Sequence, residues 1–305
     1  MKIKIFFIAF IFIAISTPLK AQYYFYDGNY YESDLFYEVG FSAGAINALT
    51  DIGGRRGIGT RGLKDFNIKT TNISGGAFFG AMYKNMVGFR LEATFGTVRS
   101  WDSILVKVAP TTNERYERNL SFKTPISEVV LIAEIHPFEM FGNYNQDKFP
   151  PVVSPYIVAG IGFFHFRPQG KLNGTFVDLR PLHTEGEGFA EYPNKKEYSL
   201  NQINIPLGFG ARYDITPKLN IRAELMHRIL FTDYLDDVST RYINPALFSK
   251  YLSGTQLADA IQLHDRSKPG AQTAHPDGIR GDPTHNDAYL TFSIKLGFTI
   301  GRERR

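Results

Sequence analysis

The sequence predicts an all-β protein, a closed antiparallel transmembrane β-barrel of eight strands with long extracellular loops. Three observations lead to this prediction. The first residues resemble a secretory signal, eight later segments alternate apolar and non-apolar side chains, and the connections between these segments alternate in length.

The N-terminal segment has the order of charged and apolar residues that export signals share. Lys2 and Lys4 precede an apolar run from 5 to 15, and Ala21 ends a plausible cleavage site. The alternative is a membrane anchor, but this run is shorter than the roughly 18 residues that a spanning helix needs. We therefore expect a signal peptide at 1–21, a periplasmic tail at 22–34, a barrel at 35–301 and a C-terminal tail at 302–305.

The composition excludes several classes of protein. The chain has no cysteine, so disulfides and thiolate metal sites are excluded. Its net charge of +4 includes three lysines within 1–21, which leaves +1 (4 − 3) on the exported chain. No basic stripe accompanies this charge, so we expect no nucleic-acid partner, and no motif calls for a cofactor or a metal.

Residues 290–300 show the clearest alternation. One face carries six apolar side chains at the even positions from Leu290 to Ile300, and the other carries Thr, Ser, Lys and Gly. Period-two alternation indicates a strand whose two faces meet different surroundings. The eight predicted strands are 35–48, 70–84, 88–97, 126–136, 154–166, 202–213, 219–232 and 290–300.

A soluble β-sandwich would alternate too, with its apolar face turned inward. Two features favour the membrane barrel. The non-apolar face is rich in Gly, Ser and Thr with single charges, which suits a narrow closed interior, and most segments reach the ~9–11 residues of a spanning strand. The longer loops have room for a further hairpin, so ten strands remain an alternative to eight.

The connections also set an expected orientation. Those at 84–85, 141–151 and 216–218 are short, whereas those at 49–69, 98–125, 167–199 and 234–287 are long. Outer-membrane barrels have short periplasmic turns and long extracellular loops, so both chain ends are expected in the periplasm.

Aromatic side chains agree with this orientation. Tyr37, Tyr83, Tyr213 and Phe298 lie on the predicted lipid face near the short turns, where an interfacial girdle belongs. His165 and His227 fall on the same face, near the outer rim of the expected apolar band, where the penalty for a polar group is small.

Charged residues on the inward faces form the candidate site. An eight-stranded barrel is only wide enough for side chains to fill it, so these charges should pair with one another. The favoured interpretation is a polar network that plugs the lumen and fixes the register, and the alternative is a gated ion path. The residues are Glu38, Arg90, Glu92, Glu128, Glu134, Arg212, Arg222, Glu224 and Lys295.

Other motifs carry weaker signals. The glycine-rich segment 53–59 lacks the ending and the strand–helix context of a phosphate loop, and we expect an outer loop there. Two acidic sets resemble calcium ligands without matching a known spacing, and His183 with Glu185 lacks a nucleophile motif. The acidic sets are Asp233, Asp236 and Asp237, and Asp282, His285 and Asp287.

The last long loop should contain a short helical insertion. Asn244 and Pro245 form a helix start, with Asn as the cap and Pro at the first position. We expect helices at 246–252 and 256–265.

A further set of motifs runs along most of the exported chain: 49–54, 116–122, 133–137, 154–162, 232–238 and 280–283 before 286–287. Together they resemble a family of Bacteroidetes outer-membrane β-barrels similar to PorG, the barrel associated with the type IX secretion machinery. The resemblance implies an accessory, non-enzymatic barrel that contacts periplasmic lipoproteins.

These observations predict a non-enzymatic outer-membrane barrel, an accessory or structural component of a secretion or envelope assembly. Its expected surroundings are outer-membrane lipid and lipopolysaccharide. Two alternatives remain open, a narrow porin-like pore for small solutes or ions and a lipid-modifying enzyme.

Overall fold

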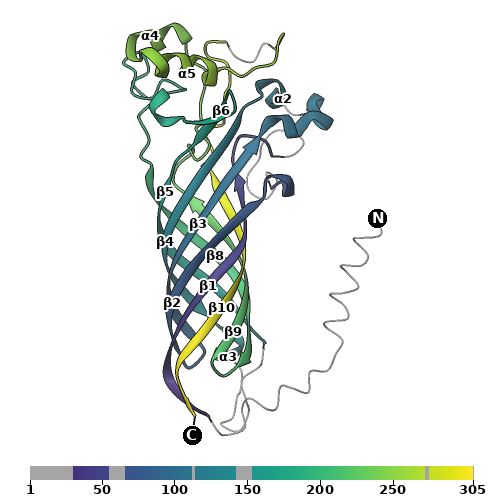
Figure 1. The fold of residues 1–305 in the computed structure, drawn as a ribbon, viewed down its shortest axis with the longest axis vertical. Helices are drawn as coiled ribbons and strands as arrows, with labels where there is room; N and C mark the ends of the chain where they lie inside the picture. The colour runs from purple at the N-terminus through teal and green to yellow at the C-terminus, as the bar shows by residue number, and fades with distance from the viewer. Residues whose placement is uncertain (1–29, 55–65, 112–113, 142–152, 272–274, 305) are drawn as a thin grey trace.

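Eight long antiparallel strands close into a barrel in the computed structural model, which describes residues 30–54, 66–111, 114–141, 153–271 and 275–304. Each strand pairs with the next, and β1 with β10 completes the circle (Figure 1). The predicted fold class is therefore confirmed. The strands are β1 (Tyr30–Leu49), β2 (Asn72–Tyr83), β3 (Val87–Trp101), β4 (Ser121–Ile135), β5 (Val153–Phe166), β8 (Asn201–Thr216), β9 (Leu219–Leu230) and β10 (Ala288–Arg304).

A further hairpin lies in the connection between β5 and β8. Its strands, β6 (Gln169–Leu172) and β7 (Thr175–Asp178), join the sheet through one pairing of β6 with β4. The hairpin stands outside the closed circle, so eight strands form the barrel and the other two belong to the loop.

The barrel has two unlike ends. At one, called the turn end, lie the short connections and the helix α3 (Pro137–Phe141) (Figure 1). At the other, the long connections form a cap, made of residues 50–54, 66–71, 102–111, 114–120, 167–200, 231–271 and 275–287. The helices of the cap are η3 (Ile68–Thr70), η4 (Asp102–Thr111), α2 (Arg115–Arg118), η5 (Arg180–Leu182), η6 (Pro245–Leu247), α4 (Phe248–Tyr251) and α5 (Gly254–His264).

The predicted helical insertion in the last loop is confirmed. The Asn244 side chain accepts a hydrogen bond from the Ala246 amide at 3.0 Å and so caps η6. The second helix, α5, begins at Gly254, two residues before its predicted start. Among the described residues, no helix is long and apolar enough to span a membrane.

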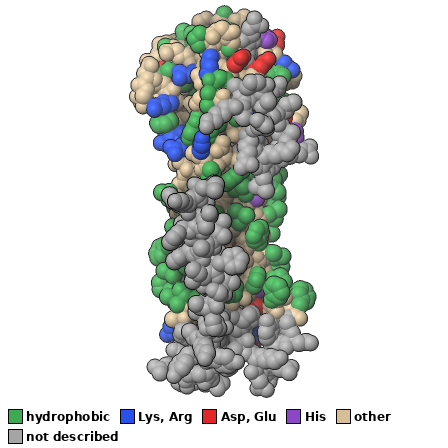
Figure 2. Space-filling model, turned by 90° about the vertical axis from the view of Figure 1, so that its right-hand side faces the viewer, with side chains coloured by type: hydrophobic (Ala, Val, Ile, Leu, Met, Phe, Trp, Pro, Cys, Tyr) green, Lys and Arg blue, Asp and Glu red, His purple; other side chains and the backbone are tan. Residues whose placement is uncertain are grey.

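Alternation along each strand turns one set of apolar side chains outward. Phe41, Phe89 and Phe209 are 60–65% exposed, whereas the Arg222 and Lys295 side chains between the strands are almost fully buried. On the face drawn in Figure 2, apolar side chains cover parts of the barrel wall below the cap. An exposed belt of this kind is stable only in contact with lipid, because a water-soluble protein buries such a surface.

Several strand boundaries differ from those predicted. β1 begins at Tyr30 and pairs with residues up to Arg304, so part of each expected tail extends the sheet. β3 and β4 continue to Trp101 and from Ser121, which shortens the predicted loop at 98–125. Backbone pairing continues beyond the stretches that alternate clearly, so hydropathy alone underestimates the length of the strands. The expected signal peptide lies outside the described residues.

Candidate functional site

A network of buried ion pairs fills the lumen from the turn end to the middle of the barrel. Arg90, on β3, lies at its centre: its guanidinium donates to Glu134 at 2.7 Å and to Glu224 at 2.6 Å, and its Nε lies 3.2 Å from Glu92. Lys295 pairs with Glu92 and lies 2.8 Å from Glu224. Four strands therefore meet through one group of side chains.

The same network continues toward the turn end. Arg222 pairs with Glu38 and Glu134, and Arg212 lies 3.2 Å from Glu38. His136 bonds to Glu134 at 2.7 Å. Arg212 also pairs with Asp214 at 2.7 Å. Four cations, Arg90, Arg212, Arg222 and Lys295, thus face five carboxylates, Glu38, Glu92, Glu134, Asp214 and Glu224.

Glu128, the ninth predicted residue, belongs to a separate pair nearer the cap. Its carboxylate lies 3.1 Å from Arg228 and accepts hydrogen bonds from Asn204 and Tyr289. Arg228 was not among the predicted residues, although the alternation along β9 places it inward beside the outward His227.

Very little space is left within the network. A cavity of about 10 Å³ lies beside Arg90, Glu134 and Arg222, which holds one water molecule at most. Glycines on the inward faces make this packing possible: a Cβ on Gly210 would lie 2.6 Å from the Tyr156 ring. Close packing and paired charge together close this part of the lumen.

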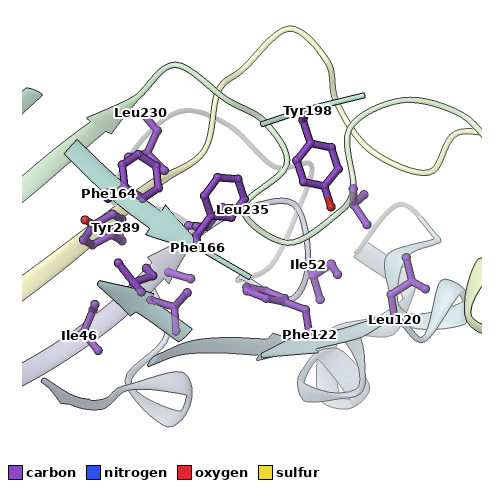
Figure 3. Close-up of a cluster of buried hydrophobic side chains, with 14 residues drawn as sticks. Ile46, Ile52, Leu120, Phe122, Phe164, Phe166, Tyr198, Leu230, Leu235 and Tyr289 are labelled. Carbon is purple, nitrogen blue, oxygen red and sulfur yellow. The ribbon is translucent and has the colours of Figure 1, made fainter. Parts of the chain in front are cut away.

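A hydrophobic plug closes the lumen at its cap end (Figure 3). Inward side chains at the ends of the strands, such as Phe122, Phe164 and Leu230, pack with Ile52 and Leu235 from the loops. The sequence analysis missed this plug, because the polarity of the two faces is reversed there. The inward side chains are apolar, whereas outward ones such as Lys123, Ser127 and His165 are polar. Its buried members are Ile46, Ala48, Ile52, Val98, Leu120, Phe122, Ile126, Phe164, Phe166, Tyr198, Leu230, Leu235, Val238 and Tyr289.

Buried polar side chains join the loops above the plug. Arg118 pairs with Asp102 at 2.9 Å and donates to the backbone of Asp51 and Arg280. The Ile52 amide donates to Asp236. Four of the motifs that carry the family resemblance therefore meet at the base of the cap.

The predicted catalytic candidates have structural partners. Glu185 is fully buried, pairs with Arg280 at 3.0 Å and accepts hydrogen bonds from Ser239 and Thr240. His183 lies 3.9 Å from Glu197. Glu185 thus anchors the loop between β9 and β10.

The two acidic sets also hold loops. Asp237 accepts from Thr184 and Tyr198, both at 2.6 Å, and Asp287 accepts from the Leu235 amide at 2.8 Å. Asp282 bonds to His285 at 2.8 Å. No group of three His, Asp or Glu side chains that could hold a metal ion occurs in the part of the chain that the structure describes.

Burial shifts the acidity of the carboxyl groups in the cap. Desolvation together with the charge of Asp51 raises the pKa of Asp233 to about 9 and that of Asp236 to about 8. Desolvation raises the pKa of Glu187 to about 8, with Asp237 adding to the effect. These groups are therefore largely protonated in the folded cap at neutral pH.

No family model and no curated protein matches this chain. Among solved structures, it is similar to neisserial surface protein A, with 11% identity, 86% of this chain and 96% of that chain covered, and a TM-score of 0.35. It is also similar to Ail of Yersinia pestis (8% identity, 88% and 100% covered, TM-score 0.36). The N-terminal barrel domain of OprF of Pseudomonas aeruginosa is a third (9% identity, 86% and 97% covered, TM-score 0.32).

The closed sheet and its lipid-facing apolar belt are the features of a barrel that spans a membrane. The chain is an outer-membrane β-barrel. Its surroundings are therefore the lipids and lipopolysaccharide of that membrane.

Proposed function

We propose that this outer-membrane barrel is a non-conducting, non-enzymatic scaffold, an accessory or structural component of a secretion or envelope assembly. The observation that carries the proposal is the double closure of the lumen. The ion-pair network fills the barrel up to its middle, and the plug fills it from there to the cap. Such a barrel can act only through its outer surfaces.

Conductance across a planar bilayer tests the closure. We expect the wild-type protein to give no single-channel steps in molar salt, because buried side chains fill both layers of the lumen. A variant that shortens the plug, Phe122→Ala with Phe164→Ala, leaves the network in place and should remain silent. Steady conductance of the wild type would overturn the proposal in favour of a pore.

The orientation is part of the proposal, with the cap outside the cell and both chain ends in the periplasm. This orientation is supported by the positions of the connections: the long ones lie at the cap end of the barrel, and the short turns lie at the turn end. The chain has no cysteine, so single cysteines can report each end. On intact cells, a membrane-impermeant maleimide should label Ser249→Cys in α4 and spare Lys218→Cys in the β8–β9 turn; the opposite pattern would reverse the orientation.

The partner follows from the same orientation and from the resemblance to PorG-like barrels. We propose periplasmic lipoproteins of a secretion complex, bound at the turn end. There, α3 exposes Phe138 by 61% and Phe141 by 80%, which offers an apolar contact.

Affinity purification from detergent extracts tests the partner. Wild-type protein should recover secretion-ring lipoproteins, Phe138→Ser with Phe141→Ser should lose them, and the cap variant Tyr251→Ser should retain them. Recovery of none by the wild type, with normal secretion in a deletion strain, would exclude the secretion role and leave the closed barrel as it stands.

A further inference from the structure

A groove crosses the outside of the barrel where the apolar belt ends. Its volume is about 540 Å³, and it opens to the surroundings of the barrel across β2 to β5. Small side chains such as Gly96, Thr97 and Ser127 lie along it, between the apolar Ile73 and Phe95 on one side and the polar His165 and Arg167 on the other.

The register of three strands places basic side chains at the cap end of this groove. Outward residues form successive rows: Ala93, Val129 and Phe163 first, then Phe95, Ser127 and His165. Beyond them, Arg99 is the direct partner of Lys123, and the Arg167 amide donates to Pro125, two residues from Lys123. The surface therefore changes from apolar to basic within two rows.

These cations are poorly neutralised. Arg167 lies 3.5 Å from Asp178, but neither Arg99 nor Lys123 has an ion pair among the residues that the structure describes. Three cations and one carboxylate leave a net charge of +2 (3 − 1) at the end of the groove. Like charges directly opposite each other destabilise a sheet. The cross-strand pair of Arg99 and Lys123 is therefore more stable when an anion lies between the two side chains.

Aromatic rings hold both side chains over the surface. The Arg99 guanidinium lies 5.7 Å from the Trp101 ring centroid, and the Lys123 ammonium lies 4.6 Å from that of Phe176. On the face drawn in Figure 2, Lys and Arg side chains also gather just above the apolar belt. A cation held in place at a lipid boundary binds phosphate with less loss of entropy than a free one.

We propose that this groove binds a phosphorylated glycolipid of the outer leaflet, lipid A, with an acyl chain along Ile73 and Phe95 and a phosphate between Arg99 and Lys123. The chemistry of the occupant follows from a groove that is apolar along Ile73 and Phe95, and from the cations without an ion pair that lie next to its cap end. The source in the outer leaflet rests on the orientation proposed above.

Native mass spectrometry of the full-length protein, refolded in detergent micelles, tests the proposal with bisphosphorylated lipid A as the probe. Arg99→Gln with Lys123→Gln should weaken binding about tenfold or more, since the variant removes two basic groups that attract the lipid phosphate. The control, Lys196→Gln with Lys218→Gln, removes the same charge at exposed sites elsewhere and should bind as the wild type does.

Two further probes decide the source of the phosphate. Lipid A stripped of its phosphates should bind the wild type about tenfold more weakly, and inorganic phosphate at millimolar concentration should not displace the intact lipid. Equal binding of the stripped lipid, displacement by inorganic phosphate, or full binding by the double variant would each overturn the proposal. Because micelles carry no orientation, this result is independent of the labelling experiment on cells.

Discussion

At the scale of single residues, the lumen shows how charge is kept inside a membrane protein. Arg90 meets three carboxylates, and each of these meets a second cation. A buried charge is costly unless it is paired, so the network is stable as a whole and sensitive to the loss of any member.

Arg90→Met should therefore be strongly destabilising. It leaves Glu92, Glu134 and Glu224 with one cation fewer, and breaking a buried pair costs about 3–5 kcal/mol. Urea unfolding in lipid vesicles, followed by the fluorescence of the only tryptophan, Trp101, measures the change. Lys218→Met in an exposed turn should leave the free energy of unfolding unchanged within ~0.5 kcal/mol, and an equal loss in both variants would contradict this account.

The sequence indicates on which face of its strand each charged side chain lies, but not which oppositely charged side chain it pairs with. Alternation alone assigns Arg90 and Glu134 to inward faces, because each outward neighbour is apolar. Their pairing depends on the register between strands, which local patterns leave open. Arg228 follows the same alternation and was overlooked beside His227.

At the scale of elements, the turn between β2 and β3 has a backbone that few residues adopt. Lys84 has φ 50° and Asn85 has φ 57°, so both central residues of the tight turn that the Met86 amide closes onto Tyr83 are left-handed. Asn tolerates this region better than most residues do, whereas a β-branched residue does not.

Asn85→Val should destabilise the barrel by about 1–2 kcal/mol, the cost of a left-handed residue with a Cβ. Asn85→Gly keeps the turn conformation and should be more stable than the Val variant. Unfolding midpoints in urea compare the two, and a Val variant as stable as the Gly variant would show that the turn conformation is not limiting.

The cap responds to pH through its buried carboxyl groups. The pKa of Asp233, about 9, and that of Asp236, about 8, lie above the ordinary value, so folding favours the protonated forms. The stability they contribute is full below the ordinary pKa of ~4 and is lost as pH rises through the folded values. We expect the cap to loosen between about pH 7 and pH 9.

A spin label at Ser249→Cys, in α4, can follow this transition. Its mobility should rise with pH in the wild type, and Asp233→Asn should move the rise to higher pH because one buried charge never forms. Asp259→Asn in α5 serves as the control. Mobility that does not change up to pH 9 would contradict the expected loosening.

The structure of the cap is the part of the fold that the sequence predicts least well. The Ile52 amide and Asp236 are 184 residues apart, and no local pattern links them. The helical insertion was predictable because its start signal, Asn244 with Pro245, is local.

At the scale of the whole molecule, the stability of the barrel in the membrane depends on apolar side chains that face the lipid and polar ones that face the lumen. Phe41 lies near the middle of the belt, opposite Leu296, and Ile300 lies near the turn end of β10. A charge on the lipid face costs most at the centre of the bilayer.

Phe41→Arg should destabilise the barrel by about 2–4 kcal/mol, and Ile300→Arg by about 0–1 kcal/mol. Folding titrations in vesicles measure both. Equal costs at the two positions would mean that the belt is not centred in the bilayer as its exposed residues indicate.

The pairing of β1 with β10 has a consequence for biogenesis. This seam joins residues 30–49 to residues 288–304, so the circle cannot close until nearly the entire polypeptide has been synthesised. Until then, two unsatisfied strand edges remain open to any other chain. Both edges must therefore be kept from pairing with other chains until the cylinder closes in a single late step.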